Sequence, residues 1–136
     1  MKKKLLGLAL LGAMMATLLV GCGSSGGKKG DTKDDVITIG FSQVGAESDW
    51  RTANSESMKS TFSEKNGYKL IFDDAQQKQE NQITAIRNFI QQEVDYILLA
   101  PVTETGWDTV LQEAKDADIP VIIVDRMIDV SDDSLY

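Results

Sequence analysis

The feature that most constrains the fold is a regular alternation of apolar runs and amphipathic segments from residue 36 onward. Four runs rich in apolar and β-branched residues predict buried strands, at 36–41, 68–72, 96–100 and 121–125. The segments between them carry apolar residues at helical spacing. Strands that are apolar on both faces and joined by helices favour a parallel sheet covered on both sides. We therefore predict an α/β fold, a parallel sheet with helices on both faces.

Three helices are expected between these strands. Ser48 is a suitable N-cap for the first, which should run to Gly67, and Gly106–Ala117 should form the third. The residues expected to face the core are Ala53, Met58 and Phe62 in the first helix, Ile83, Ile86, Phe89, Ile90 and Val94 in the second, and Val110, Leu111, Ala114 and Ala117 in the third. Trp107 is expected to pack at the start of the third helix. The side chains of Gln76, Gln77, Gln79 and Gln82 are expected to form a solvated start to the second.

No closing strand or helix is predicted after Asp125, and the chain ends at Tyr136. Parallel sheets of this kind usually contain five or more strands. We therefore expect residues 36–136 to be an incomplete lobe of a larger domain.

The N-terminal residues have the layout of an export signal. Lys2, Lys3 and Lys4 precede an apolar stretch at 5–20 that is short for a membrane span. The run Leu19-Val20-Gly21-Cys22 resembles the bacterial lipoprotein processing box, which implies a signal peptide at 1–21, lipidation of Cys22 and membrane attachment. Residues 22–35 are mainly Gly, Ser, Lys and Asp, a composition typical of a flexible tether. The alternative is an ordinary signal peptide with an incidental cysteine.

Composition excludes several classes of function. The chain has no histidine and a single cysteine, so histidine-based catalysis and an internal disulfide are both excluded. A net charge of −7 at pH 7 argues against a nucleic-acid partner. Neither the Gly-x-Gly-x-x-Gly nor the Gly-x-x-x-x-Gly-Lys pattern occurs, so no nucleotide cofactor is expected. No metal ligand cluster or nucleophile–base pair is visible, and we do not expect an enzyme.

Ligands of open parallel sheets bind beyond the carboxyl ends of the strands. The residues predicted there are Ser42, Gln43, Glu47, Trp50 and Arg51 after the first strand, Asp73, Asp74, Gln76 and Gln77 after the second, Pro101, Thr103 and Glu104 after the third, and Asp125 and Arg126 after the fourth. Carboxylates and amides accept hydrogen bonds from sugar hydroxyls, arginine donates them, and an indole packs on the apolar face of a sugar ring. The set therefore favours a neutral polyol as ligand.

Each of these residues also has a purely structural explanation. Trp50 could be part of the core, and Asp125 with Arg126 could be an ion pair of a loop. Asp73 and Asp74 fit a turn at the start of the second helix better than a ligand or metal site.

Several motifs together resemble the sugar-binding receptors of bacterial ABC importers, the ribose- and galactose-type periplasmic binding proteins. The motifs are Gly40-Phe41-Ser42-Gln43-Val44-Gly45, Glu47, Trp50-Arg51, Gln76 to Ile83, Ala100-Pro101-Val102, Thr105-Gly106-Trp107, Glu113 to Ala117, Ile119-Pro120-Val121, Asp125-Arg126, Ile128-Asp129-Val130 and Ser134-Leu135-Tyr136. Within that family the galactofuranose-binding receptors are most similar. The resemblance covers essentially everything after the tether, and it implies two lobes that close on a sugar, of which 36–136 is an incomplete N-terminal lobe.

The resemblance also implies a set of ligand-binding residues. They are Glu47, Trp50, Arg51, Asp125 and Arg126, with Ser42 and Gln43 as weaker candidates. Asp49 departs from the smaller residue usual at that position, which puts its contact in doubt. The implied partners are a monosaccharide, permease subunits of the importer and, through Cys22, the outer face of the membrane. The alternatives are a sugar sensor for a membrane kinase and an inactive truncated product.

Overall fold

The computed structural model describes residues 36–136. The predicted signal peptide at 1–21, the lipidation site Cys22 and the tether at 22–35 lie outside the described residues. The strands are β1 (Ile37–Gln43), β2 (Tyr68–Asp74), β3 (Tyr96–Leu99) and β4 (Val121–Ile123). The helices are α1 (Asp49–Thr61), α2 (Gln79–Gln91) and α3 (Asp108–Asp116), with short 3₁₀ turns η1 (Glu64–Asn66) and η2 (Asp133–Leu135).

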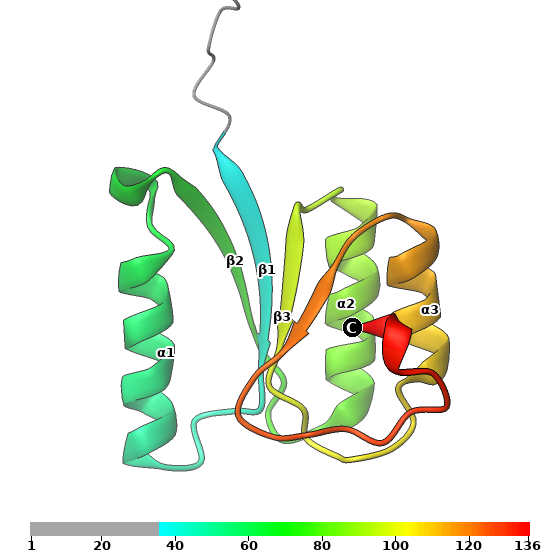
Figure 1. The fold of residues 1–136 in the computed structure, drawn as a ribbon. Helices are drawn as coiled ribbons and strands as arrows, with labels where there is room; N and C mark the ends of the chain where they lie inside the picture. The colour runs from blue at the N-terminus through cyan, green and yellow to red at the C-terminus, as the bar shows by residue number, and fades with distance from the viewer. Residues whose placement is uncertain (1–35) are drawn as a thin grey trace, which may run out of the picture. The chain divides into compact units, whose positions relative to one another are not determined.

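The four strands form one parallel sheet in the order β2-β1-β3-β4. α1 covers one face of the sheet, while α2 and α3 cover the other (Figure 1). This confirms the predicted α/β fold with helices on both faces. Because all strands run in the same direction, their carboxyl ends meet at one edge of the lobe.

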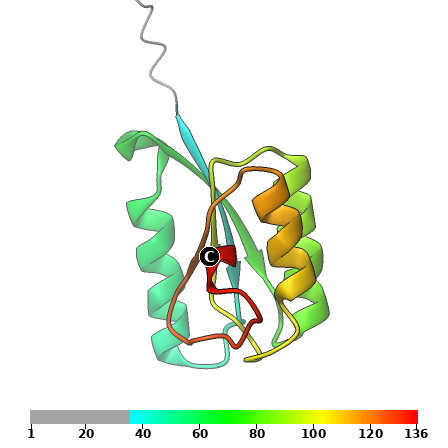
Figure 2. The same cartoon turned by 45° about the vertical axis from the view of Figure 1, so that its right-hand side comes forward.

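Two apolar clusters hold the layers together. The larger lies between the sheet and α2 and α3, where Trp107, Leu111 and Ile97 are fully buried. The C-terminal residues Ile128 and Leu135 also pack into it, and η2 lies against α3 (Figure 2). The smaller cluster lies on the α1 face and is centred on Phe41.

Gly40 is needed where α2 crosses β1. A Cβ atom at this position would lie 2.4 Å from the Phe89 ring, far inside contact distance. The absence of a side chain therefore allows the helix to approach the centre of the sheet.

Three details of the helices differ from expectation. α1 ends at Thr61 rather than at Gly67, which instead closes η1 in a left-handed conformation with φ of 85°. Ala53 was expected to be buried but is exposed. Ala117 was also expected to face the core but is exposed. It is the C-cap of α3, and its N–H donates to carbonyl groups of the last helical turn. Ser48 caps α1 as predicted, accepting a hydrogen bond from the N–H of Arg51 at 3.1 Å.

No helix within residues 36–136 combines the length and apolar character that crossing a bilayer requires.

Candidate functional site

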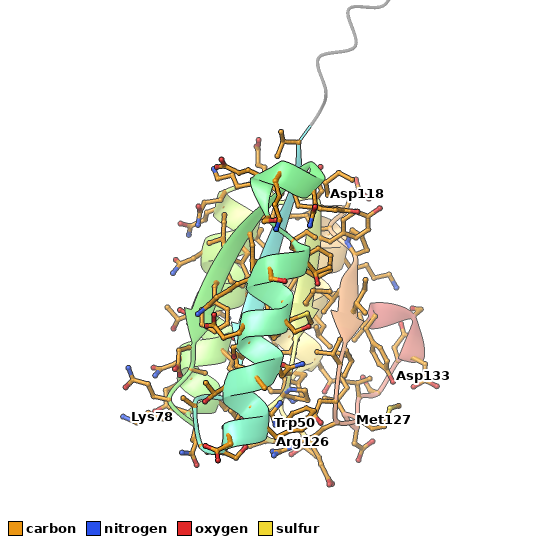
Figure 3. The ribbon with its side chains drawn as sticks, turned by 90° about the vertical axis from the view of Figure 1, so that its left-hand side faces the viewer. Trp50, Lys78, Asp118, Arg126, Met127 and Asp133 are labelled. Carbon is orange, nitrogen blue, oxygen red and sulfur yellow. The ribbon has the colours of Figure 1, made fainter. Side chains whose placement is uncertain are left out.

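The carboxyl edge of the sheet gathers most of the predicted site residues. Glu47, Trp50 and Arg51 belong to the β1–α1 connection and the first turn of α1, and Asp125 and Arg126 follow β4. Figure 3 shows Trp50, Arg126 and Met127 at the same end of the lobe, opposite the end that carries Asp118. Segments more than seventy residues apart in sequence thus meet at one edge.

Arg51 is the centre of a polar network at this edge. Its Nε donates to Glu47 Oε1 at 3.0 Å, and its Nη2 donates to Asp125 Oδ2 at 2.8 Å. Its Nη1 donates to Gln43 Oε1 at 3.2 Å. The Arg51 side chain is only 3% exposed, whereas the side chains of Glu47 and Asp125 are 25% and 26% exposed. A buried cation paired with two carboxylates in this way links β1, α1 and the end of β4.

Gln43 fixes the position of Arg51. Its amide nitrogen donates to Asn54 Oδ1 at 2.8 Å and approaches Ser55 Oγ at 3.2 Å, both on α1. Its amide oxygen accepts from the N–H of Val44 as well as from Arg51. Every polar atom of this buried side chain is therefore occupied, and direct contact between Gln43 and a ligand stays a prediction.

Asp125 reaches Arg51 from a strained turn. The N–H of Arg126 donates to Val124 O at 2.9 Å, and Asp125 between them has φ of 74°. This is a γ-turn of the rarer form with positive φ. Aspartate tolerates a left-handed backbone better than most residues, and such strain is often found at functional sites.

The expected pairing of Asp125 with Arg126 is weaker than its pairing with Arg51. Arg126 Nε lies 3.6 Å from Asp125 Oδ2, and its side chain is 50% exposed. The Arg126 guanidinium therefore keeps most of its donors free for another partner.

Trp50 is not a core residue. Its side chain is 57% exposed, and the Arg51 guanidinium carbon lies over the ring at 4.8 Å from its centroid. The interaction between cation and ring holds the indole at the edge of the lobe without burying it. The sequence left open whether Trp50 packs in the core or contacts a ligand. Its exposure excludes the core and leaves the ring available for contact.

A pocket of about 400 Å³ lies beside these residues. We call it the strand-end pocket; it is lined by Val102, Thr103, Glu104, Arg126, Met127, Ile128 and Asp129. The N–H of Asp129 donates to Glu104 O at 2.7 Å, which joins the two loops that form its walls.

The network shifts the acid–base behaviour of its members. Burial works to raise the pKa of Glu47, but hydrogen bonds from its own backbone N–H and from Arg51 hold that pKa below its usual value. Burial likewise tends to lower the pKa of Arg51, and the hydrogen bonds with Asp125 and Glu47 overcome this effect and raise it. The ion pair between Glu47 and Arg51 therefore stays charged at neutral pH.

Ser42 and Asp73 lie at the same edge but away from its surface. They are register partners on β1 and β2, and Ser42 is completely buried. Neither Ser42 Oγ nor Asp73 Oδ1 has a hydrogen-bond partner in the structure. Burial, together with the charge of Asp74, raises the pKa of Asp73. Contact between Ser42 and a ligand stays a prediction.

Gln82 was assigned wrongly from the sequence. It was expected in a solvated helix start, but it is fully buried under the ends of β1 and β3. Gln79 is half-buried and donates to Thr105 O at 2.7 Å. Among residues 36–136, no group of three or more Cys, Asp or Glu side chains is arranged to hold a metal ion.

Comparison with known proteins places this lobe in a family. Residues 39–136 match the family model described as a periplasmic binding protein domain. The galactofuranose-binding protein YtfQ of Escherichia coli is 59% identical over 74% of this chain and 31% of its own length. The fructose import binding protein FruE of Bifidobacterium longum is 36% identical over 96% of this chain and 39% of its own length.

Solved structures agree with the sequence relatives. A crystal structure of a galactofuranose-binding protein matches with a TM-score of 0.71 and 59% identity, covering 74% of this chain and 33% of that one. The periplasmic binding protein of the arabinose ABC transporter from Shewanella sp. ANA-3, bound to α- and β-L-arabinofuranose, matches with a TM-score of 0.71 and 62% identity over the same shares. These relatives are binding proteins rather than enzymes, in agreement with the expectation for this chain.

The chain spans about a third of the length of these relatives. Its match to the family model nevertheless covers most of its residues. The match includes β2, β3 and β4 in full and all of β1 except its first two residues. The fold, the sequence identity and the matched range therefore agree that the chain belongs to the periplasmic binding protein domain family.

Proposed function

We propose that this chain is part of the sugar-binding component of an ABC importer and that it contributes one wall of a monosaccharide site. The observation that carries the proposal is the Asp125–Arg51–Glu47 network, flanked by exposed Trp50 and Arg126, at the carboxyl edge of the sheet. In the complete protein the sugar would lie between this edge and a second lobe, and binding of both lobes would favour closure.

The chemistry of this edge suits a neutral sugar. The two carboxylates keep about a quarter of their surface exposed, so each has acceptor capacity for sugar hydroxyls. Arg126 offers free donors, and the exposed indole of Trp50 offers a flat apolar surface for ring C–H groups. Since the Arg51 charge is already balanced by its partners, the network does not require a charged ligand.

A furanose is the proposed class of sugar. Support comes from the relatives near 60% identity, whose names and titles mention galactofuranose and arabinofuranose. Delivery to permease subunits and attachment to the outer face of the membrane through a lipid on Cys22 complete the proposal.

The test is a binding titration with the natural full-length protein, produced from Gly23 onward so that it is soluble. Tryptophan fluorescence and calorimetry would be recorded with D-galactose, L-arabinose, D-ribose and D-fructose, all of which interconvert between ring sizes in water. We expect saturable binding to at least one sugar with a furanose form. A Trp50→Phe control should lose much of the fluorescence change while calorimetric binding remains. Absence of binding to every sugar of the panel would refute the proposal.

A further inference from the structure

Gln82 is the most completely buried amide on the α2 side of the sheet. It lies near the start of α2, and its side chain has no exposed surface. Its Nε2 donates to Ala100 O at 2.7 Å and lies 3.5 Å from Ser42 O, while its Oε1 accepts from the N–H of Val102 at 2.8 Å. One side chain therefore holds the backbone on both sides of residue 101.

That residue is Pro101, and the backbone groups on either side of it lie where the pairing of β3 with β1 ends. The hydrogen bond from Ala100 N to Ser42 O at 3.0 Å is the last one that joins the end of β3 to β1. The next backbone groups on the β1 side are the carbonyl of Ala100 and the N–H of Val102, and both pair with Gln82 instead of with β1. Gln82 supplies a donor and an acceptor where a neighbouring strand would otherwise supply them, so the chain beyond β3 keeps a fixed path.

The fixed segment leads directly into the strand-end pocket. Val102, which donates its N–H to Gln82, is followed by Thr103 and Glu104, and these three residues line the pocket together with Arg126 and Met127. A shift of the Ala100–Val102 peptide would therefore change the width of the pocket without altering any residue on its surface.

We propose that Gln82 is a positioning residue for the sugar site, which sets the place of the Val102–Glu104 wall relative to Arg126. The inference rests on the proposed function and adds to it a residue that does not touch the ligand. A purely structural role would be visible in the stability of the lobe alone. A positioning role must also be visible in the affinity of the folded protein.

Comparing the sugar affinity of Gln82→Glu at low and at high pH separates the structural role from the positioning role. Protonated glutamic acid keeps the shape of glutamine and donates to Ala100 O, but the carboxylate turns an oxygen toward the carbonyl oxygens of Ala100 and Ser42. Burial raises the pKa of such a carboxyl, and negative charge on Asp73 at the end of β2 and on Glu104 in the loop after β3 acts in the same direction. Ionisation should therefore fall within the range from about pH 5 to pH 8.

The experiment measures Kd by calorimetry at several values between pH 5 and pH 8, with L-arabinose and D-galactose as probes and the natural full-length protein. The wild type serves as the internal standard, and circular dichroism confirms folding at each pH. We expect Gln82→Glu to bind almost as the wild type does at pH 5 and about tenfold more weakly at pH 8. Gln82→Met, which loses both hydrogen bonds without titrating, should bind about tenfold more weakly at every pH.

Gln91→Glu is the matched control, since it adds the same charge to an exposed position of the same helix. It should follow the wild type throughout. Suppose that the wild type binds sugar and that folded Gln82→Glu and Gln82→Met have the wild-type Kd at each pH. The positioning role is then wrong, even if the melting temperatures of both variants fall. If the wild type binds no sugar, the proposed function has failed first, and the positioning role fails with it.

Discussion

Replacing Arg51 by methionine tests whether the buried network is the structural centre of the site. Methionine keeps much of the apolar length of the side chain but removes all three hydrogen bonds, to Glu47, Gln43 and Asp125. Loss of the shared cation leaves two carboxylates whose remaining positive neighbour is the exposed Arg126, 3.6 Å from Asp125 Oδ2.

The cost follows from how deeply these groups are buried. Removing one partner of a buried ion pair costs about 3–5 kcal/mol, because the remaining charge is left without compensation. Here both carboxylates are about one-quarter exposed, so water recovers part of the loss. We therefore expect the free energy of unfolding to fall by about 3 kcal/mol, toward the lower end of that range. Arg51→Lys, which keeps the charge but not the planar fork, should cost less.

Urea unfolding with a constant m-value is the suitable assay. For an m-value of about 1–3 kcal/mol/M, the expected loss lowers the midpoint by about 1–3 M. Asp125→Asn and the double variant complete a mutant cycle, and the double variant should lose less than the sum of the two single losses. A loss below about 1 kcal/mol for Arg51→Met, or strictly additive losses in the cycle, would refute the assignment of Arg51 as the centre of the network.

Three further variants test the edge of the sheet. Trp50→Ala should weaken sugar binding by up to about tenfold, through loss of ring packing, and leave urea unfolding unchanged because the side chain is 57% exposed; an unaltered calorimetric Kd would remove Trp50 from the site. Arg126→Ala should also weaken binding by about tenfold with little effect on stability, since Asp125 keeps its partner Arg51; a large shift in the urea midpoint would contradict this assignment. Asp73→Asn should raise the free energy of unfolding at pH 7, because it replaces a carboxylate, whose charge is disfavoured by burial and by the charge of Asp74, with a neutral amide. The raised pKa of Asp73 means that its charge destabilises the fold above that pKa and that the penalty disappears as pH falls, so the gain should shrink in unfolding experiments near pH 4; an equal gain at both pH values would contradict the role of charge.

The sequence was sufficient to predict the layers of the fold. Strands with apolar residues on both faces leave few alternatives to a covered parallel sheet, and Ile86, Phe89 and Leu111 are buried as their helical spacing predicts. The end of α1 was predicted less well. The helix stops at Thr61 because its C-terminus depends on local hydrogen bonds, which the periodicity of apolar residues does not show.

The site was predicted only as a set of residues at one edge. That Glu47, Arg51 and Asp125 lie after two different strands could be read from the pattern, since carboxyl ends of parallel strands meet. Their pairing could not, because adjacency in sequence favoured Asp125 with Arg126. The γ-turn at Asp125 directs the carboxylate toward Arg51, and no local pattern of residue types predicts a positive φ at an aspartate.

Gln82 escaped prediction for a different reason. Glutamine is usually exposed, and four glutamines near one helix start have the composition of a solvated surface. Only the backbone groups that it meets, on either side of Pro101, distinguish it from its neighbours. A polar residue one turn into a helix that follows a buried strand, together with a proline at the end of the next strand, is the signal that could have identified it.

The two buried glutamines meet the same physical requirement on opposite faces of the sheet. Where parallel strands end, backbone and side-chain polar groups are taken from water without a continuing ladder to receive them, and each one left unpaired costs free energy. An amide donates and accepts at once and carries no charge, so Gln43 and Gln82 satisfy these groups without a desolvated ion. Ser42 Oγ and Asp73 Oδ1, which no amide reaches, remain unpaired beside them. Among the charged groups of this edge, contact with a ligand is proposed for the network around Arg51 and for exposed Arg126.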